Sequence, residues 1–341
     1  RCRSARRAMI DQRPHEALRL LGVMTLLLLT VGLSLTVGAR SVPWSEIWAG
    51  LNGRIETIGA AAVAVRMPRT LLAVLAGGAL GIAGAVMQGI TRNPLADPGI
   101  LGVNAGAALF VVIGIAWFDI SGATTFLWLG IAGAGAAAVF VYAIGSSGQG
   151  GATPLKLTLA GTATSIAASA FIIAVVLPCN DIAGNIQSWQ VGGIGGARFD
   201  TILPALPFFA AGLLLSLASA RVLNALALGD ELAAGLGQNV ALGRALAAAG
   251  AIVLCGSATA LCGPIGFVGL VVPHMCRMFV GIDYRLLIPL SALGGATLLG
   301  LADVLGRIIA RPNELDVGIV TAFVGAPFFI WTVRRQRMRG L

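Results

Sequence analysis

Long apolar runs, separated by short polar or glycine- and proline-rich breaks, recur along the whole chain. A helix needs about 20 apolar residues to cross roughly 30 Å of hydrocarbon. The runs are continuous rather than alternating, which argues against an outer-membrane barrel. We therefore predict ten membrane-spanning helices, at residues 17–38, 68–91, 99–118, 124–144, 155–177, 202–220, 242–262, 263–281, 286–305 and 317–333.

Composition supports the same fold class. Apolar residues make up 57% of the 341 residues and charged residues only 11%, against about 25% charged in soluble domains. A soluble chain of this length would need far more surface charge, so a soluble enzyme, a disordered chain and a disulfide scaffold are excluded. The sequence predicts an all-α polytopic membrane protein with one transmembrane domain at 17–333, a tail at 1–16 and a basic tail at 334–341.

The distribution of basic residues predicts the orientation. With ten spans both tails lie on one side, and sixteen of the 23 Lys and Arg residues fall on that side. Cytoplasmic loops of membrane proteins carry this excess. We therefore expect both termini in the cytoplasm, and we assign the net charge of +9 to membrane orientation rather than to nucleic-acid binding.

Two segments interrupt the apolar pattern, at 93–99 and 263–269. Irregular backbone at membrane depth is tolerated only where protein or a water-filled cavity satisfies its polar groups. Such breaks are typical of transporters. We assign the pathway and broken-helix roles to Asn93, Pro94, Asn104, Gly263 and Pro264.

Charged residues near the predicted span ends allow two interpretations each. Arg66, Arg69 and Arg307 are either interfacial side chains or a basic ring that pairs with carboxylates of an outside partner. Asp303 is a functional candidate as an intramembrane acid, although an i, i+4 pair with Arg307 is the simpler explanation. The segment 221–241 is either a solvated connector or a docking surface for a cytosolic partner.

Several chemistries have no candidate residues. The only lysine is Lys156, and it is not part of the Gly-Lys-Ser/Thr of a nucleotide-binding loop. The two histidines and five cysteines form no metal-ligand motif, so no metal site is expected. The chain is therefore expected to be no enzyme and to bind no cofactor, and any ATP-driven step must occur on another polypeptide. A proton relay is also missing, which disfavours the alternative of an ion-coupled secondary transporter.

The order and spacing of several motifs resemble the FecCD/BtuC family of ABC-importer permeases. The motifs are RMPRT at 66–70, MQG at 87–89, TRNPLADPGILGV at 91–103, LGD at 228–230, GPIGFVGLVVPH at 263–274 and ELDVGIVTAFVGAPFF at 314–329. The resemblance implies a type II ABC importer permease fold in a bacterial inner (plasma) membrane. It also implies a second permease subunit, identical or related, a cytosolic ABC ATPase dimer that carries ATP and Mg, and a periplasmic or lipid-anchored substrate-binding protein.

The resemblance further implies roles for individual residues. Arg66, Arg69 and Arg307 match positions that dock the binding protein, and Ser146 and Ser147 match the cytoplasmic gate by position in their loop. The ATPase-coupling positions are Leu226, Gly229, Asp230, Glu231, Ala234 and Gly237. The sequence departs from the family pattern at two places on the predicted outer side: Asp316 stands where the family usually has Pro, and 189–194 lacks the usual Trp-x-x-Gly-Ser-Leu.

The predicted function is import of an iron–siderophore complex by alternating access. The segments 255–260 and 303–307 resemble the ferric-siderophore branch more than the vitamin B12 branch, and haem or cobalamin remains the alternative ligand. The other classes left open are an ion-coupled secondary transporter and a non-transport receptor or scaffold.

Overall fold

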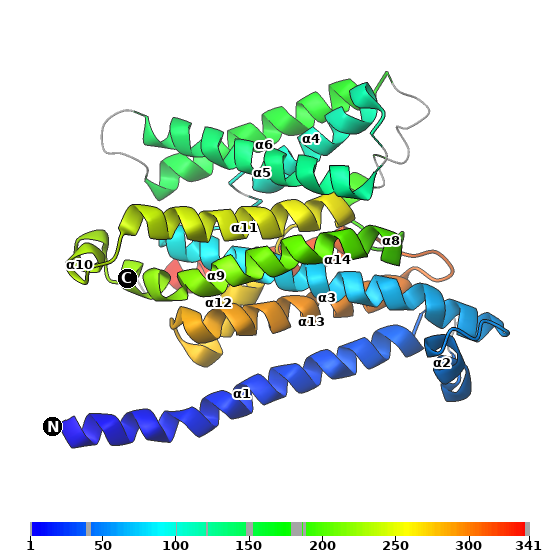
Figure 1. The fold of residues 1–341 in the computed structure, drawn as a ribbon, viewed down its shortest axis with the longest axis horizontal. Coiled ribbons are helices and arrows are strands. Elements are labelled where there is room, and N and C mark those ends of the chain that lie inside the picture. Colours follow the sequence, from blue (N-terminus) through cyan, green and yellow to red (C-terminus); the bar gives the residue numbers. More distant parts are fainter. Residues whose placement is uncertain are drawn as a thin grey trace.

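The computed structural model describes residues 2–38, 42–99, 101–120, 122–147, 153–178, 186 and 189–337. Every regular element in these ranges is helical (Figure 1). The elements are α1 (Cys2–Thr36), α2 (Trp44–Leu51), α3 (Ile58–Thr91), α4 (Val103–Phe118), α5 (Ala123–Ser146), α6 (Pro154–Val176), α8 (Phe199–Ile202), the 3-10 turn η1 (Leu203–Ala205), α9 (Leu206–Leu226), α10 (Asp230–Gly235), α11 (Val240–Cys262), α12 (Val268–Val280), α13 (Tyr284–Ile309) and α14 (Val317–Arg337).

The predicted spans correspond to ten of these helices. Seven stretches, within α1, α3, α5, α6, α8 to α9, α11 and α13, are long and apolar enough to cross a membrane, and α4, α12 and α14 contribute shorter apolar helices. This arrangement confirms the predicted fold class.

Some predicted boundaries are wrong. Helix α3 begins at Ile58 rather than at 68, because Pro68 lies inside the helix instead of starting it. Proline is tolerated inside membrane-spanning helices, where the surroundings can satisfy the backbone group that loses its partner. Helices α4 and α12 begin four or five residues later than predicted, because 92–99, 101–102 and 263–267 form irregular turns. The short helix α2 was not predicted.

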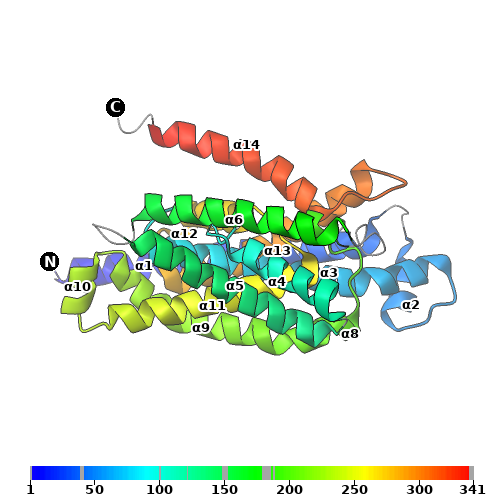
Figure 2. The same ribbon diagram turned by 90° about the horizontal axis from the view of Figure 1, so that it is seen from above.

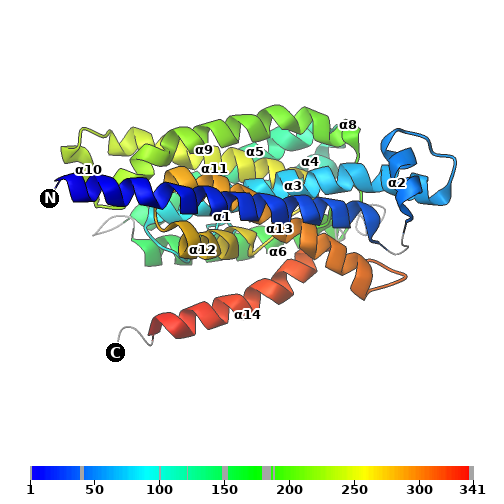
Figure 3. The same ribbon diagram turned by 90° about the horizontal axis from the view of Figure 1, so that it is seen from below.

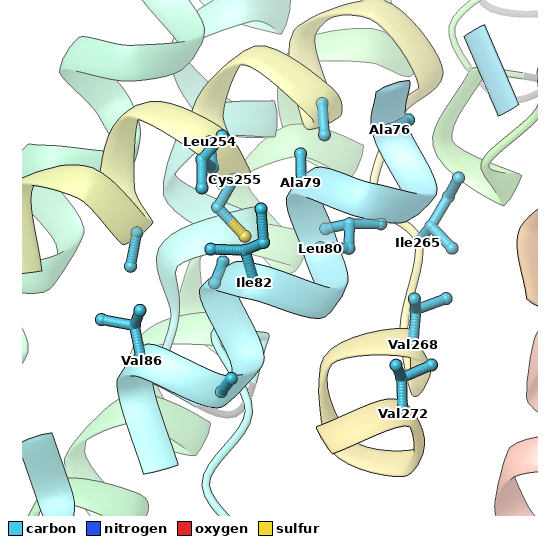
Figure 4. Packing of buried hydrophobic residues seen from close by; sticks show 14 of the residues in the cluster. Ala76, Ala79, Leu80, Ile82, Val86, Leu254, Cys255, Ile265, Val268 and Val272 are labelled. Atoms are coloured by element: carbon cyan, nitrogen blue, oxygen red, sulfur yellow. The ribbon is translucent and has the colours of Figure 1, made fainter. Parts of the chain in front are cut away.

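Helix α3 is the centre of the bundle. It packs against α13, α11, α12 and α9. In its most apolar stretch of 18 residues, 83% of the residues are buried. Figure 4 shows apolar side chains of α3 between α11 and the segment that leads into α12. The side chains that meet there are Ala76, Ala79, Leu80, Ile82 and Val86 from α3, Leu254 and Cys255 from α11, Ile265 before α12, and Val268 and Val272 of α12.

Glycines allow the helices around α3 to approach closely. A Cβ atom placed on Gly295 of α13 would lie 2.1 Å from the carbonyl oxygen of Gly77, and one on Gly84 would lie 1.9 Å from that of Gly269. Helix association in lipid depends on van der Waals packing, so small residues at the contact determine how near two backbones can lie.

Helix α14 diverges from the rest of the bundle (Figures 2 and 3). It contacts α13 and α12, and beside it lies an open apolar hollow of about 600 Å³. The hollow is lined by Val191, Gly318, Ile319, Ala322, Phe323, Ala326, Pro327 and Ile330. One apolar face of α14 is therefore uncovered within this chain.

We expect Gly295→Ala to destabilise the protein by about 1–3 kcal/mol, because an added methyl group would force α13 away from α3. Gly32→Ala on α1 is the matched control, since nothing lies within 4 Å of an added Cβ there. Thermal unfolding of the purified protein in detergent measures both. Equal melting temperatures for Gly295→Ala and the wild type would contradict the close contact.

Candidate functional site

The first broken segment is the loop that leaves α3. Arg92 ends the helix in a left-handed conformation, with φ at 50°. Asn93 Oδ1 then accepts a hydrogen bond from the Leu95 amide at 3.0 Å. The loop next enters the protein interior, where Ala96 and Asp97 are buried. Two prolines explain why the helix ends here, because Pro94 and Pro98 each disfavour helical backbone at the residue before them.

The second broken segment, 263–267, is held by polar side chains from neighbouring helices. The Asn104 amide nitrogen, at the start of α4, donates to the Ile265 carbonyl at 3.4 Å. Its oxygen accepts from Cys255 Sγ at 3.1 Å and Thr259 Oγ1 at 3.5 Å. Gln88 of α3 donates to the Gly269 carbonyl at 3.2 Å. These contacts satisfy backbone that has no helical partner.

Asp97 connects the two broken segments. One carboxylate oxygen accepts a hydrogen bond from the Gly99 amide at 2.8 Å, and the other lies 2.7 Å from where a Cβ on Gly269 would be. A carboxylate beside the first turn of α12 is also favoured by the helix dipole.

The structure thus brings Asn104 next to the segment that follows Gly263 and Pro264, while Asn93 and Pro94 lie at the other end of their loop. The pathway role of these five residues stays a prediction. Sequence reasoning missed Gln88, Asp97, Cys255 and Thr259. A signal was available for Gln88, Cys255 and Thr259, since each is a polar or polarisable residue within an apolar or small-residue stretch. The contact of Asp97 is long-range and gives no local signal.

A linking segment, 189–193, joins the end of α11 to the start of α14. The Gly193 amide donates to the Cys262 carbonyl and the Gly318 amide donates to the Gly192 carbonyl, both at 2.8 Å. Gly263 has a φ of 71°, and a Cβ there would lie 1.9 Å from the Trp189 carbonyl oxygen. Only glycine fits that position.

A cavity of about 580 Å³ lies beside this linking segment. Its lining includes Phe126, Trp189, Leu261 and Asp316. Burial raises the pKa of the Asp316 carboxyl, and the positive charge of Arg69 opposes that rise. Asp316, one of the two departures from the family pattern, is half-buried and adds a carboxyl group to the cavity wall.

An ionic cluster lies where α1, α3 and α13 meet. We define it as Arg69, Asp303, Arg307 and Glu314, of which only Glu314 is exposed. Arg69 contacts Asp303 Oδ1 at 2.7 Å and Glu314 at 2.5 Å. Arg307 contacts Asp303 Oδ2 at 2.6 Å, which confirms the predicted i, i+4 pair. Asp303 is fully buried, and Arg307 is 1% exposed.

Two arginines also donate hydrogen bonds to the free backbone carbonyls at the end of α1. Arg307 donates to the carbonyls of Ser34 and Val37 at 3.0 and 3.1 Å. Arg66 donates to the carbonyls of Leu35 and Thr36 at 3.0 and 3.2 Å. The last carbonyls of a helix have no partner within the helix, and these guanidinium groups supply one.

The three arginines do lie at one end of the bundle, as a basic ring requires, but they are buried rather than interfacial. Arg66 and Arg69 are each 8% exposed. The sequence could not show that the end of α1 and the loop with Glu314 cover them. Their role in docking a binding protein stays a prediction.

The predicted coupling residues lie at the opposite end, around α10. Asp230 forms ion pairs with Arg92 and, at 2.8 Å, with Arg244. Leu226 is buried, whereas Glu231, Ala234 and Gly237 are exposed and Gly229 is half-buried. Leu228, Leu232 and Leu236 are each at least 60% exposed, so this segment presents apolar side chains on its surface.

The predicted gate serines end α5. Ser146 and Ser147 both donate to the Ala143 carbonyl, at 3.1 and 2.8 Å. The loop that follows, at 148–152, lies outside the described residues. A gating role for the two serines stays a prediction.

We expect Asp303→Ala to destabilise the protein by about 3–5 kcal/mol, because it leaves two buried guanidinium groups without their shared carboxylate. Arg198→Ala is the control, since the Arg198–Asp200 pair has both side chains mostly exposed and such pairs contribute little. The melting temperatures of the two variants in detergent measure the difference. If they match, the cluster does not stabilise the fold.

Comparison with known proteins finds relatives that match almost the full length of the chain. The profile of the FecCD transport family matches residues 26–335. The chain is 43% identical over 330 residues to the ferric enterobactin transport system permease protein FepD of Escherichia coli (strain K12), covering 95% of this chain and 97% of the relative. It is 42% identical to the Fe(3+)-citrate import system permease protein YfmD of Bacillus subtilis (strain 168), with 90% and 91% covered.

A haem transporter component and a solved structure are also similar. The hemin transport system permease protein HmuU of Yersinia pestis is 38% identical, with 93% of this chain and 96% of the relative covered. A metal-chelate type ABC transporter solved in an inward-facing conformation superposes with a TM-score of 0.79 at 29% identity, covering 94% and 99%. The chain therefore belongs to the FecCD transport family and is a permease subunit of an ABC importer.

Proposed function

We propose that this permease carries an iron–siderophore complex inward across the inner (plasma) membrane by alternating access. The observation that carries the proposal is the similarity to FepD, which is 43% identical across 95% of this chain and whose name specifies ferric enterobactin. Relatives named for Fe(3+)-citrate and Fe(3+)-hydroxamate support an iron-chelate ligand. Haem is the second candidate, because HmuU is named for hemin.

Energy for transport comes from a partner in this proposal. The chain has no nucleotide-binding motif, so ATP and Mg bind a cytosolic ABC ATPase dimer. That dimer docks on the segment 221–241, where Leu228, Leu232 and Leu236 are exposed and fit an apolar groove. This assignment puts the α10 end of the bundle and both termini in the cytoplasm.

A second permease subunit, identical or related, covers the uncovered face of α14. The apolar lining of the hollow beside this helix supports pairing through apolar contact. The central pathway then runs between the two subunits, and Ser146 and Ser147 lie near its cytoplasmic gate.

A substrate-binding protein docks at the opposite end, near the ionic cluster. Glu314 is the accessible member of the cluster, with 41% of its side chain exposed. A partner carboxylate that reaches Arg69 would have to displace Glu314 first. Exchanging Arg69 for Glu is a poor test of docking, because it would place a second carboxylate against buried Asp303.

Uptake into proteoliposomes tests the proposal. The chain is reconstituted with its ATPase and binding protein, and iron-loaded siderophores, haem and cobalamin are offered with or without ATP at the ATPase side. We expect ATP-dependent uptake of a ferric siderophore, and none when the ATPase carries a substituted nucleotide-binding lysine. Uptake that ignores ATP but collapses with an uncoupler would instead indicate an ion-coupled carrier, and ATP-dependent uptake of haem alone would overturn the ligand assignment.

A further inference from the structure

The ion pair between Arg92 and Asp230 joins two parts of the chain that are far apart in sequence. Asp230 is the first residue of α10, and Arg92 is the residue that ends α3. Both side chains are partly exposed, at 46% and 39%. A pair of this kind has modest strength, so it can hold two elements in contact and still rearrange.

Backbone hydrogen bonds hold the loop after Arg92 together and attach it to α4. The Ala96 amide donates to the Asn93 carbonyl at 3.1 Å, and the Leu101 amide donates to the Asp97 carbonyl at 3.2 Å. The Val103 amide donates to the Pro98 carbonyl at 3.1 Å, which fixes the loop to the first residue of α4. These hydrogen bonds connect Arg92, through the loop, to Asp97 and to the start of α4.

At its far end the loop contacts the second broken segment. Asp97 lies against Gly269 in the first turn of α12, and Asn104 of α4 binds the Ile265 carbonyl. Contacts therefore continue from α10 through Arg92, the loop 93–99 and Asp97 to the break before α12. Coupling between sites needs such a contiguous set of contacts, and a test of its energy.

The second partner of Asp230 does not extend this route. Arg244 lies on α11, the helix that follows α10 directly in the chain, and its pair with Asp230 holds α10 against that helix. Loss of Arg244 would loosen α10, while the connection to the loop would remain.

We propose that the Arg92–Asp230 ion pair transmits displacement of α10 to the loop 93–99 and, through Asp97, to the broken segment before α12. Arg92 is thus a positioning residue for transport. The inference rests on the proposed function, because it needs a partner that displaces α10 when it binds or hydrolyses ATP.

Coupling is measured as substrate imported for each ATP hydrolysed by the reconstituted complex. We expect Arg92→Ala to reduce this ratio about tenfold, within the range of typical coupling energies, while ATP hydrolysis continues. Arg92→Lys should recover part of the ratio because it keeps the charge. Arg285→Ala, at an exposed arginine near the start of α13 and outside the segment 221–241, is the matched control for loss of one positive charge, and Arg244→Ala should lower the ratio less than Arg92→Ala.

A covalent link distinguishes transmission from simple stabilisation. In a background without the five native cysteines, Arg92→Cys with Asp230→Cys should couple poorly when reduced and recover when a short bifunctional thiol reagent joins the two residues. An unchanged ratio in Arg92→Ala, or no recovery after cross-linking, would overturn the inference. If the wild-type complex itself shows no ATP-dependent uptake, the proposed function fails instead, so the two failures are distinguishable.

Discussion

A backbone polar group that is buried in lipid must find its partner inside the protein, and this constraint shapes the structure. Unbroken helices meet it by themselves. The chain departs from unbroken helices at 92–99 with 101–102 and at 263–267, and at both places side chains supply the missing partners. Asn104 and Gln88 bind carbonyls around the second break, and Asp97 binds within the first. The breaks are therefore stable parts of the fold.

The same constraint explains the ionic cluster. The carbonyls that end α1 point at Arg66 and Arg307 rather than at water. Buried guanidinium groups are costly unless they are paired, and Asp303 and Glu314 supply the pairing charge. Four segments meet as a result: the end of α1, α3, α13 and the loop that leads into α14. A movement of α14 would have to break the Arg69–Glu314 ion pair, which is the most exposed pair of the cluster.

Local apolar patterns were enough to predict the ten apolar helices that correspond to the spans and the two breaks, but not the short helix α2. Helix starts were harder to predict, as Pro68 shows: a proline in sequence suggests a helix boundary, yet Pro68 lies inside α3. Motif order in the sequence was enough to indicate the family.

Long-range pairings could not be read from the sequence. The arginines were recognised as a group, but Arg69 and Arg307 are buried because Glu314 and the end of α1 cover them, and no local pattern reports that. Asp97 was missed for the same reason, since its second contact lies 172 residues away at Gly269. The Asp303–Arg307 pair was predictable because both residues lie on one helix.

If the Arg92–Asp230 ion pair transmits displacement, α10 and the loop after α3 move together relative to the rest of the bundle. Pulsed electron paramagnetic resonance tests it with spin labels at Leu232 and Pro94, and with a reference pair at Leu232 and Phe140 on α5. Labels are compared in the reconstituted complex without nucleotide and with the ATPase trapped in its ATP-bound state. We expect the Leu232–Phe140 distance to change while the Leu232–Pro94 distance stays constant. A Leu232–Pro94 distance that changes as much as the reference would contradict it.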